Sequence, residues 1–434
     1  MVSHTTNALP LSLSNQFPIP TSVATKIRLS MLSTAMVDAL GGPSEFQGRF
    51  SFPFVTDMGP NTNFPGYELP PGVWTDDTSM TLCLAASLSG FSDGTQTKED
   101  RNANGRFDEI HQLTLYSRWK DEGYLSSIDK CFDIGDTTKF ALIDFKRQSD
   151  AGVDREAILD HLKKTFSKDA YSGNGSLMRV LPVGLAYWRN EEQAKTLARR
   201  SSLTTHPNSI CQEVCEVWTG AITLILKNTT NGTIATTGPE VKISKLDVLA
   251  YFAHFPYTTY KLANALGIPH GIPPASTNLT EREAWYFQYH PILKLIKETQ
   301  GPNAEAAGSK IVDESFPYYI PSEEKLSSSG FVLHTAVAAL YCFFATRTFE
   351  EGALMAVNLG RDADTVGAIY AGLAGCWYSY AEGEDIEDSV FWTDKVRSWR
   401  DGLIKRNVVE EIAECLVLEE EKMKGASTMS NSAM

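Results

Sequence analysis

Apolar residues recur at helical spacing along most of the chain. Between residues 21 and 40 they return every three or four positions, and the Gly-Gly-Pro sequence at 41–43 predicts the end of this helix. Similar stretches predict helices within 109–170 and over 331–345. Period-2 alternation, which is typical of strands, is nearly absent. The pattern therefore predicts an all-α protein, a compact single domain built as an orthogonal helical bundle.

The pattern changes at both ends and once in the interior. Residues 1–20 are polar and interrupted by prolines, and residues 419–434 are charged, so we expect flexible tails on a domain at 21–418. The least regular part is 228–325, where two helix-like patches, 243–266 and 281–299, lie between polar loops. We interpret this part as an insertion of helices and loops within the same domain.

Two acidic clusters stand directly before apolar, alanine-rich predicted helices. Their members are Thr75, Asp76 and Asp77 in the first cluster, and Asp362, Asp364 and Thr365 in the second. One aspartate is enough to cap a helix, and further carboxylates near a core need a compensating charge. If the two helix starts meet, their oxygen atoms suit Mg²⁺, Mn²⁺ or Ca²⁺ better than zinc. The alternative is a pair of unrelated helix caps.

Two further segments carry residues that could face a ligand. The turn Gly173-Asn174-Gly175-Ser176 precedes a predicted helix, where exposed N–H groups suit a diphosphate. It lacks a P-loop lysine, and a purely structural turn explains it equally well. His206 stands before Pro207 at the start of a long predicted helix, and a hydrogen-bonded structural histidine is the simpler interpretation.

Composition restricts the classes of partner. The 434 residues are 42% hydrophobic and 21% charged, as in globular proteins, and the net charge of −14 argues against nucleic acid and against anionic membranes. No stretch reaches the roughly 20 apolar residues of a membrane span. The seven cysteines include no CxxC pair, so they predict neither a disulfide framework nor a zinc site. They indicate a reduced, intracellular protein, cytoplasmic or nuclear.

Taken in order, these motifs resemble the ADP-ribosylglycohydrolase family, and its branch of dinitrogenase-reductase-activating glycohydrolases most of all. The matching segments are DALGGPSEF (38–46), WTDDTSM (74–80), CFDIG (131–135), GNGSLMRVLPVGL (173–185), LTTHP (203–207), SSGFVLHTAVAAL (328–340) and NLGRDADTVGAIYAGLAG (358–375). TDDT and DADT in this order and at this distance are the specific part of the resemblance.

The resemblance implies two divalent cations, Mg²⁺ or Mn²⁺, at the centre of an all-α fold. The implied ligands are Thr75, Asp76, Asp77, Asp362, Asp364 and Thr365. Glu45 would lie near the metals and Asp133 near the scissile bond. ADP-ribose would lie against residues that include the glycine turn, namely Gly173, Asn174, Gly175, Ser176, His206, Gly330 and Phe331.

The implied activity is hydrolysis of the glycosidic bond at C1 of the distal ribose, which releases ADP-ribose from a modified protein, with arginine as the first choice of acceptor. Asp77 or Glu45 would act as base for the attacking water, and Asp133 would orient the leaving guanidinium. The partners would be ADP-ribose and the ADP-ribosylated protein, and we expect a monomer. The alternatives are an ADP-ribose-binding pseudoenzyme and a binuclear-metal hydrolase of other ADP-ribose or nucleotide derivatives.

Two positions depart from the pattern of this family. Val37 stands where a glycine is usual, and Arg361 stands where glycine or aspartate is commoner. The positive charge of Arg361 beside Asp362 would alter the second metal site. These two residues are the support for the pseudoenzyme alternative.

Overall fold

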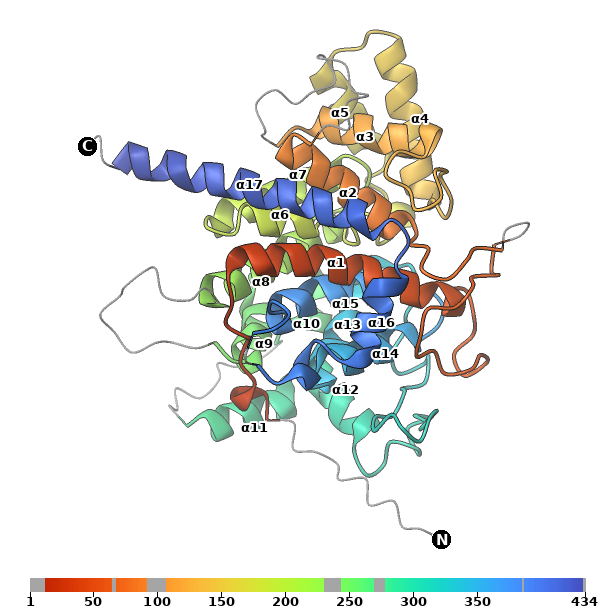
Figure 1. Cartoon of the computed structure of the whole chain (residues 1–434), viewed down its shortest axis with the longest axis vertical. Coiled ribbons are helices and arrows are strands. Elements are labelled where there is room, and N and C mark those ends of the chain that lie inside the picture. The colour runs from red at the N-terminus through yellow and green to blue at the C-terminus, as the bar shows by residue number, and fades with distance from the viewer. Residues whose placement is uncertain are drawn as a thin grey trace.

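The computed structural model describes residues 12–64, 68–91, 107–229, 243–268, 278–384 and 386–431. Over these ranges the chain forms seventeen α-helices and no β-strand, which confirms the predicted all-α class (Figure 1). In chain order the helices are α1 (Val23–Gly41), α2 (Asp76–Ser89), α3 (Glu109–Glu122), α4 (Asp136–Asp150), α5 (Arg155–Thr165), α6 (Leu181–Ala186), α7 (Glu191–Leu203), α8 (Ser209–Thr229), α9 (Lys245–His254), α10 (Tyr260–Leu266), α11 (Leu279–Tyr289), α12 (Pro291–Gln300), α13 (Val332–Ala345), α14 (Phe349–Val357), α15 (Ala363–Tyr378), α16 (Asp394–Gly402) and α17 (Arg406–Asn431).

Helix α15 forms the centre of the fold. Every one of its residues is buried, and α1, α13 and α14 pack against it. Its sequence, rich in alanine and glycine, gives it no polar face, which is typical of a helix enclosed on all sides. The acidic residues at its start are therefore held inside the protein.

Helices α1 and α15 approach each other closely in antiparallel order. A Cβ atom on Gly41 would lie 2.4 Å from the Cα of Asp364, and one on Gly375 would lie 2.8 Å from the Cα of Ser30. The absence of side chains at these glycines lets the two backbones touch. The end of α1 is thereby fixed against the acidic start of α15.

The N-terminal segment is packed from residue 12 onward, which differs from the tail expected over 1–20. Leu13 is buried, and its N–H donates to Oε1 of Glu283 on α11 (2.6 Å). The hydroxyl of Ser14 donates to Oε2 of the same carboxylate (2.6 Å). Residues 1–11 lie outside the described part of the chain.

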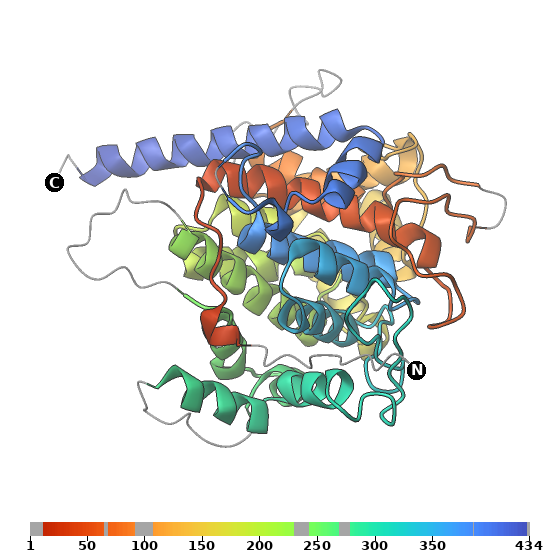
Figure 2. The same ribbon diagram turned by 60° about the horizontal axis from the view of Figure 1, so that its bottom comes forward.

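The C-terminal segment also differs from the expected tail. Helix α17 continues through Asn431, and its end projects beyond the other helices in both views (Figures 1 and 2). The residues after 418 include glutamate, lysine and methionine, which are strong helix formers, so the charge did not end the helix. Residues 432–434 are outside the described ranges.

The insertion at 228–325 packs on the domain through its helices. Helix α9 contacts α8, and α10 and α12 contact α13. The teal helices of the insertion lie at the lower edge of the molecule in Figure 2. The end of the insertion is held by Arg49, whose guanidinium donates to the carbonyl oxygens of Pro321 (2.9 Å) and of Leu326 (2.6 Å), the residue directly after it. Residues 230–242 and 269–277 of the insertion are outside the described ranges.

Helix α8 is the described helix that is long and apolar enough to cross a membrane, which the sequence pattern had not indicated. Of its apolar window, 78% is buried inside the protein, where it contacts α7 and α13. This burial matches the role of a core helix.

Candidate active site

The start of α2 is capped by a carboxylate from α1. Asp38 is fully buried, and it accepts hydrogen bonds from the N–H groups of Thr75 (2.9 Å) and Thr78 (3.0 Å). These bonds satisfy N–H groups that a helix start leaves without partners. Burial raises the pKa of Asp38 to about 6, although the threonine bonds act in the opposite direction. Sequence reasoning gave Asp38 no role.

The two acidic clusters meet, although 288 positions separate the residues that join them. The hydroxyl of Thr365 lies 3.1 Å from Oδ2 of Asp77 and 2.9 Å from Oδ1 of Asp362. The hydroxyl of Thr75 lies 3.2 Å from the same Asp77 oxygen. The starts of α2 and α15 therefore form one site, which excludes two unrelated helix caps.

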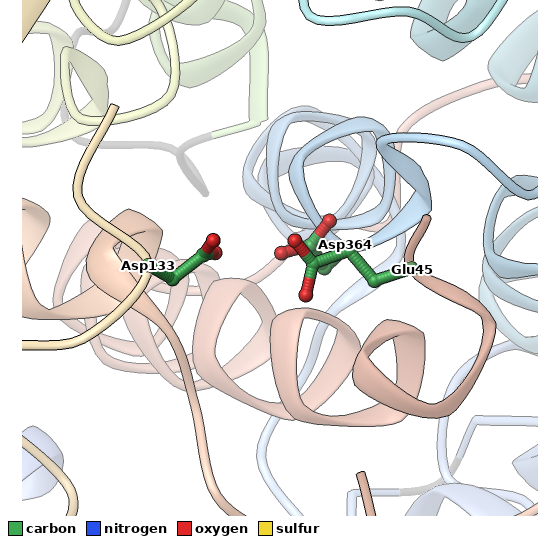
Figure 3. Close-up of side chains that lie close together, drawn as sticks. All are labelled: Glu45, Asp133 and Asp364. Atoms are coloured by element: carbon green, nitrogen blue, oxygen red, sulfur yellow. The ribbon is translucent and has the colours of Figure 1, made fainter. Parts of the chain in front are cut away.

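Three carboxylates from different parts of the chain face one another at this site. Glu45 follows the last residues of α1, Asp133 lies in the loop before α4, and Asp364 is in the first turn of α15. One oxygen from each lies within 4.8 Å of the others, and Figure 3 shows Asp133 pointing across toward Glu45 and Asp364. Burial and the neighbouring carboxylates raise the pKa of all three.

Several of the buried carboxylate oxygens have no hydrogen-bond donor. They are both oxygens of Asp364, Oδ1 of Asp77 and Oε2 of Glu45. Carboxylate oxygens in this state are costly unless they bind a proton or a cation. A set of carboxylate and hydroxyl oxygens without histidine or cysteine fits Mg²⁺ or Mn²⁺, so these residues suit the cations that the family resemblance implies.

A pocket of about 490 Å³ opens beside this cluster. Of the residues predicted for the site, those that line it are Glu45, Asp76, Asp133, Gly173, Asn174, Gly175, His206, Gly330, Asp362 and Thr365. The others that the sequence selected do not line it, namely Thr75, Asp77, Asp364, Ser176 and Phe331. Asp77 and Asp364 are buried next to residues that do line the pocket. Asp77 contacts Thr365, and Asp364 lies beside Glu45 and Asp133.

The glycine turn is attached directly to the acidic cluster. The side-chain amide of Asn174 donates to Oδ2 of Asp362 (2.6 Å) and to the hydroxyl of Thr335 (3.0 Å), and its backbone N–H donates to the carbonyl of Gly330 (3.0 Å). A Cβ atom on Gly175 would lie 2.8 Å from the ring of His206. The turn is thus both a structural feature and a wall of the pocket.

The base of the turn holds a buried arginine that sequence reasoning missed. Arg179 is fully buried and donates to the carbonyl of Gly175 (2.9 Å) and the hydroxyl of Thr205 (2.7 Å). The same hydroxyl lies 2.8 Å from Nδ1 of His206. Burial, reinforced by Arg179, lowers the pKa of His206 to about 3, so this histidine is neutral at physiological pH.

Two of the selected residues do not line the pocket. The buried hydroxyl of Ser176 accepts from Ser202 (2.9 Å), toward α7. Phe331 forms a backbone bridge with Gly173, and its ring packs on His334 with 5.0 Å between ring centroids. Their contribution to the pocket is to hold the glycine turn in place.

The departures from the family pattern have structural explanations. Val37 is fully buried and packs on Gly367, where a Cβ atom would lie 2.9 Å from its side chain. Arg361 has a left-handed backbone (φ 60°), which glycine adopts without strain and which explains why glycine is commoner there. Its guanidinium donates to Glu323 of the insertion (2.9 Å), so its charge is paired at the rim of the pocket.

Comparison with known proteins agrees with the geometry. A profile of the ADP-ribosylglycohydrolase family matches residues 20–426. The ADP-ribosylarginine hydrolase Tri1 of Serratia proteamaculans (strain 568) is 26% identical over 400 residues, covering 90% of this chain and 78% of that protein. The enzyme of the same name from Pseudomonas putida (strain GB-1) is 25% identical over 392 residues, covering 89% and 80%. An uncharacterised protein of Archaeoglobus fulgidus is 33% identical over 397 residues, covering 89% and 94%.

A solved structure titled as an ADP-ribosylglycohydrolase-related protein complex has the same fold. It aligns with a TM-score of 0.54 and 28% identity, covering 92% of this chain and 99% of that one. The matches span the pocket and the helices that form it. The chain therefore belongs to the ADP-ribosylglycohydrolase family and is a hydrolase of glycosidic bonds.

Proposed function

We propose that this protein is a metal-dependent ADP-ribosyl hydrolase that cleaves the bond between C1 of the distal ribose and an arginine side chain of a modified protein. The observation that carries the proposal is the meeting of Glu45, Asp133 and Asp364 oxygens within 4.8 Å beside a pocket of about 490 Å³. That volume is in the range of small-molecule sites. The likeness to two ADP-ribosylarginine hydrolases supports arginine as the acceptor.

The proposed cofactor is a pair of divalent cations, Mg²⁺ or Mn²⁺. The residues that would hold them are Thr75, Asp76, Asp77, Asp362, Asp364 and Thr365, which supply carboxylate and hydroxyl oxygens. When bound, such ions fix the hydroxyl groups of a ribose and lower the pKa of a bound hydroxyl or water. The buried oxygens of Asp364 that have no donor are the strongest support for this assignment.

The positions of the carboxylates favour Glu45 as the general base. Glu45 lines the pocket, and its Oε2 has no hydrogen-bond donor. Asp77, the other candidate, lies beneath the pocket and already has two threonine hydroxyls at one oxygen. Glu45 is therefore placed to take the proton from a water that attacks C1.

Asp133 is placed to handle the leaving group. Its carboxylate points toward Glu45 and Asp364 (Figure 3), and its backbone has a left-handed conformation (φ 57°). Strain of this kind is found where a structure holds a functional group in one orientation. We assign Asp133 to accept paired hydrogen bonds from the departing guanidinium.

The glycine turn supplies the wall for the rest of the ligand. Gly173, Asn174 and Gly175 line the pocket beside the neutral ring of His206. Because Gly173 and Gly175 carry no side chain, a diphosphate can approach the backbone closely there. The ADP part of the ligand would thus lie along the turn, with its distal ribose beside the acidic cluster.

The alternative of a pseudoenzyme loses its support in this geometry. Val37 packs inside the α1–α15 contact and does not line the pocket. Arg361 reaches the rim, where Glu323 pairs with its charge. Neither residue removes a carboxylate from the acidic cluster.

We also propose that the protein works in a reducing compartment of the cell. All seven cysteines are free thiols, and five of them are buried. A protein that keeps this many free thiols is typical of the cytosol or nucleus.

One assay tests the proposal. The purified protein is incubated with proteins carrying arginine-linked and, separately, serine-linked ADP-ribose, with Mg²⁺, with Mn²⁺ and with a chelator. We expect free ADP-ribose from the arginine linkage, loss of release with the chelator, and a loss of at least a hundredfold in Glu45→Gln. Intact substrate in every arm would support the pseudoenzyme, and inorganic phosphate or a mononucleotide would support a different hydrolase.

A further inference from the structure

One phenylalanine at the pocket, Phe46, combines an exposed ring with a strained backbone. Phe46 directly follows Glu45, lines the pocket and is 55% exposed. Its backbone is left-handed (φ 59°), although bulky residues rarely adopt this conformation. A strained backbone that presents an exposed ring at a pocket is the combination expected of a ligand-binding residue.

Phe46 is one member of an aromatic arc, which we define as Phe46, Phe64 and Phe132. The ring of Phe46 meets the edge of Phe64 at 5.7 Å, and Phe64 meets Phe132 at 5.6 Å, both with nearly perpendicular planes. These edge-to-face contacts are favourable, and they fix the orientation of the exposed ring. The backbone N–H of Phe46 also donates to the carbonyl of Arg361 (2.6 Å).

Two rings of the aromatic arc are next in the chain to carboxylates of the site, Glu45 and Asp133. Phe46 is the neighbour of Glu45 in the chain, and Phe132 is the neighbour of Asp133. Each loop therefore brings one carboxylate to the acidic cluster and one ring to the arc. Of the three rings, Phe46 lines the pocket, and its contact through Phe64 connects it to Phe132 in the loop that carries Asp133.

The charges around the pocket favour a cation at this place. The acidic side chains that line it include Glu45, Asp133 and Asp136. Among the described residues that line it, the one lysine or arginine is Arg361, and Glu323 pairs with that charge. Aromatic faces next to carboxylates attract planar cations, most of all guanidinium groups.

We propose that the aromatic arc binds the guanidinium of the modified arginine and gives the enzyme its preference for arginine over serine linkages. This inference rests on the proposed function and adds the residues that select the acceptor. A serine acceptor offers no cation to the rings, so it gains nothing from the arc. The arc is a binding element, and the bond is broken by the carboxylates described above.

The test compares Phe46→Leu, which removes the aromatic face but keeps an apolar side chain, with Phe46→Tyr, which keeps the face. We expect Phe46→Leu to raise KM for arginine-linked substrate roughly tenfold, with a smaller change in kcat, and Phe46→Tyr to stay within about threefold. Phe17→Leu is the matched control, because Phe17 is 43% exposed and does not line the pocket. Agmatine carries a free guanidinium, so we expect it to inhibit the release of ADP-ribose. This inhibition should weaken in Phe46→Leu by a similar factor.

The outcomes separate the two proposals. If the unmodified protein releases no ADP-ribose from arginine, the proposed function fails before any variant is compared. If it does release ADP-ribose and Phe46→Leu keeps its KM and its sensitivity to agmatine, the aromatic arc does not bind the acceptor. An equal loss on arginine-linked and serine-linked substrates would likewise overturn the inference, because it would show a general effect on the pocket.

Discussion

Thr78 donates both its backbone N–H (3.0 Å) and its hydroxyl (2.5 Å) to a single oxygen, Oδ2 of Asp38. The other oxygen of Asp38 receives the same pair of donors from Thr75. A carboxylate from the last turn of α1 thus holds the first residues of α2 through four hydrogen bonds. Asp76 and Asp77 lie between these threonines. Asp38 therefore sets the position of both carboxylates, although it does not line the pocket itself.

Replacing Asp38 by asparagine should destabilise the protein and reduce its activity. The amide NH₂ of asparagine would face donors at one of the two positions, and hydrogen bonds to a charged acceptor would be lost. We expect a loss of about 2–3 kcal/mol in the free energy of unfolding. Thermal unfolding measures it, with Asp150→Asn as the control because Asp150 pairs with Lys146 at the surface. An unchanged Tm would contradict the capping role.

The contact between α1 and α15 should tolerate no added methyl group at Gly41. A Cβ atom there would lie 2.4 Å from the Cα of Asp364, so Gly41→Ala must push the two helices apart. We expect a loss of about 1–3 kcal/mol together with a strong loss of ADP-ribose release, since Asp364 moves. Gly402→Ala is the control, because its new Cβ would meet only the sulfur of Met58 at 3.6 Å. Full activity of Gly41→Ala would show that this contact does not position the cluster.

Local pattern was enough to place several elements. The helix expected over 21–40 is Val23–Gly41, and the one expected over 331–345 is Val332–Ala345. Apolar periodicity and glycine stops are properties of neighbouring residues, so they can be read from the chain directly. The patch 281–299 proved to be two helices, because Pro291 starts a new helix where the periodicity continues.

The residues that sequence reasoning missed act through distant partners. Asp38 looks like one more polar residue of α1, and its partners Thr75 and Thr78 lie 37 and 40 positions away. Arg179 looks like the end of a motif, whereas it reaches Thr205 across 26 positions. No periodicity reports contacts of this kind, and only the folded chain brings these groups together.

His206 should make the protein sensitive to acid. Its pKa is about 3 in the folded protein against 6.5 for an ordinary histidine, so the unfolded chain binds more protons between these values. Above pH 6.5 the histidine is neutral in both states, so it does not lower the free energy of unfolding. As the pH falls from 6.5 toward 3, that free energy decreases by at most about 1.4 kcal/mol per pH unit.

Urea unfolding of the wild type and of His206→Gln between pH 7 and pH 4 measures this effect. We expect the variant, which cannot bind a proton there, to lose stability less steeply as the pH falls, whatever its stability at pH 7. His161→Gln on the surface of α5 is the control for the loss of a histidine from the chain. Equal slopes for His206→Gln and the wild type would show that the ring does not resist protonation.

Direct counting of bound metal ions tests the central claim, which is that the starts of α2 and α15 form one site for paired divalent cations. Protein freed of metal with a chelator is titrated with Mn²⁺, and bound ions are counted by calorimetry and by elemental analysis after dialysis. The account predicts two Mn²⁺ per chain in the wild type and at most one in Asp364→Ala, because Asp364 has both oxygens buried without a donor. A wild-type protein that binds no Mn²⁺ yet still releases ADP-ribose would contradict it.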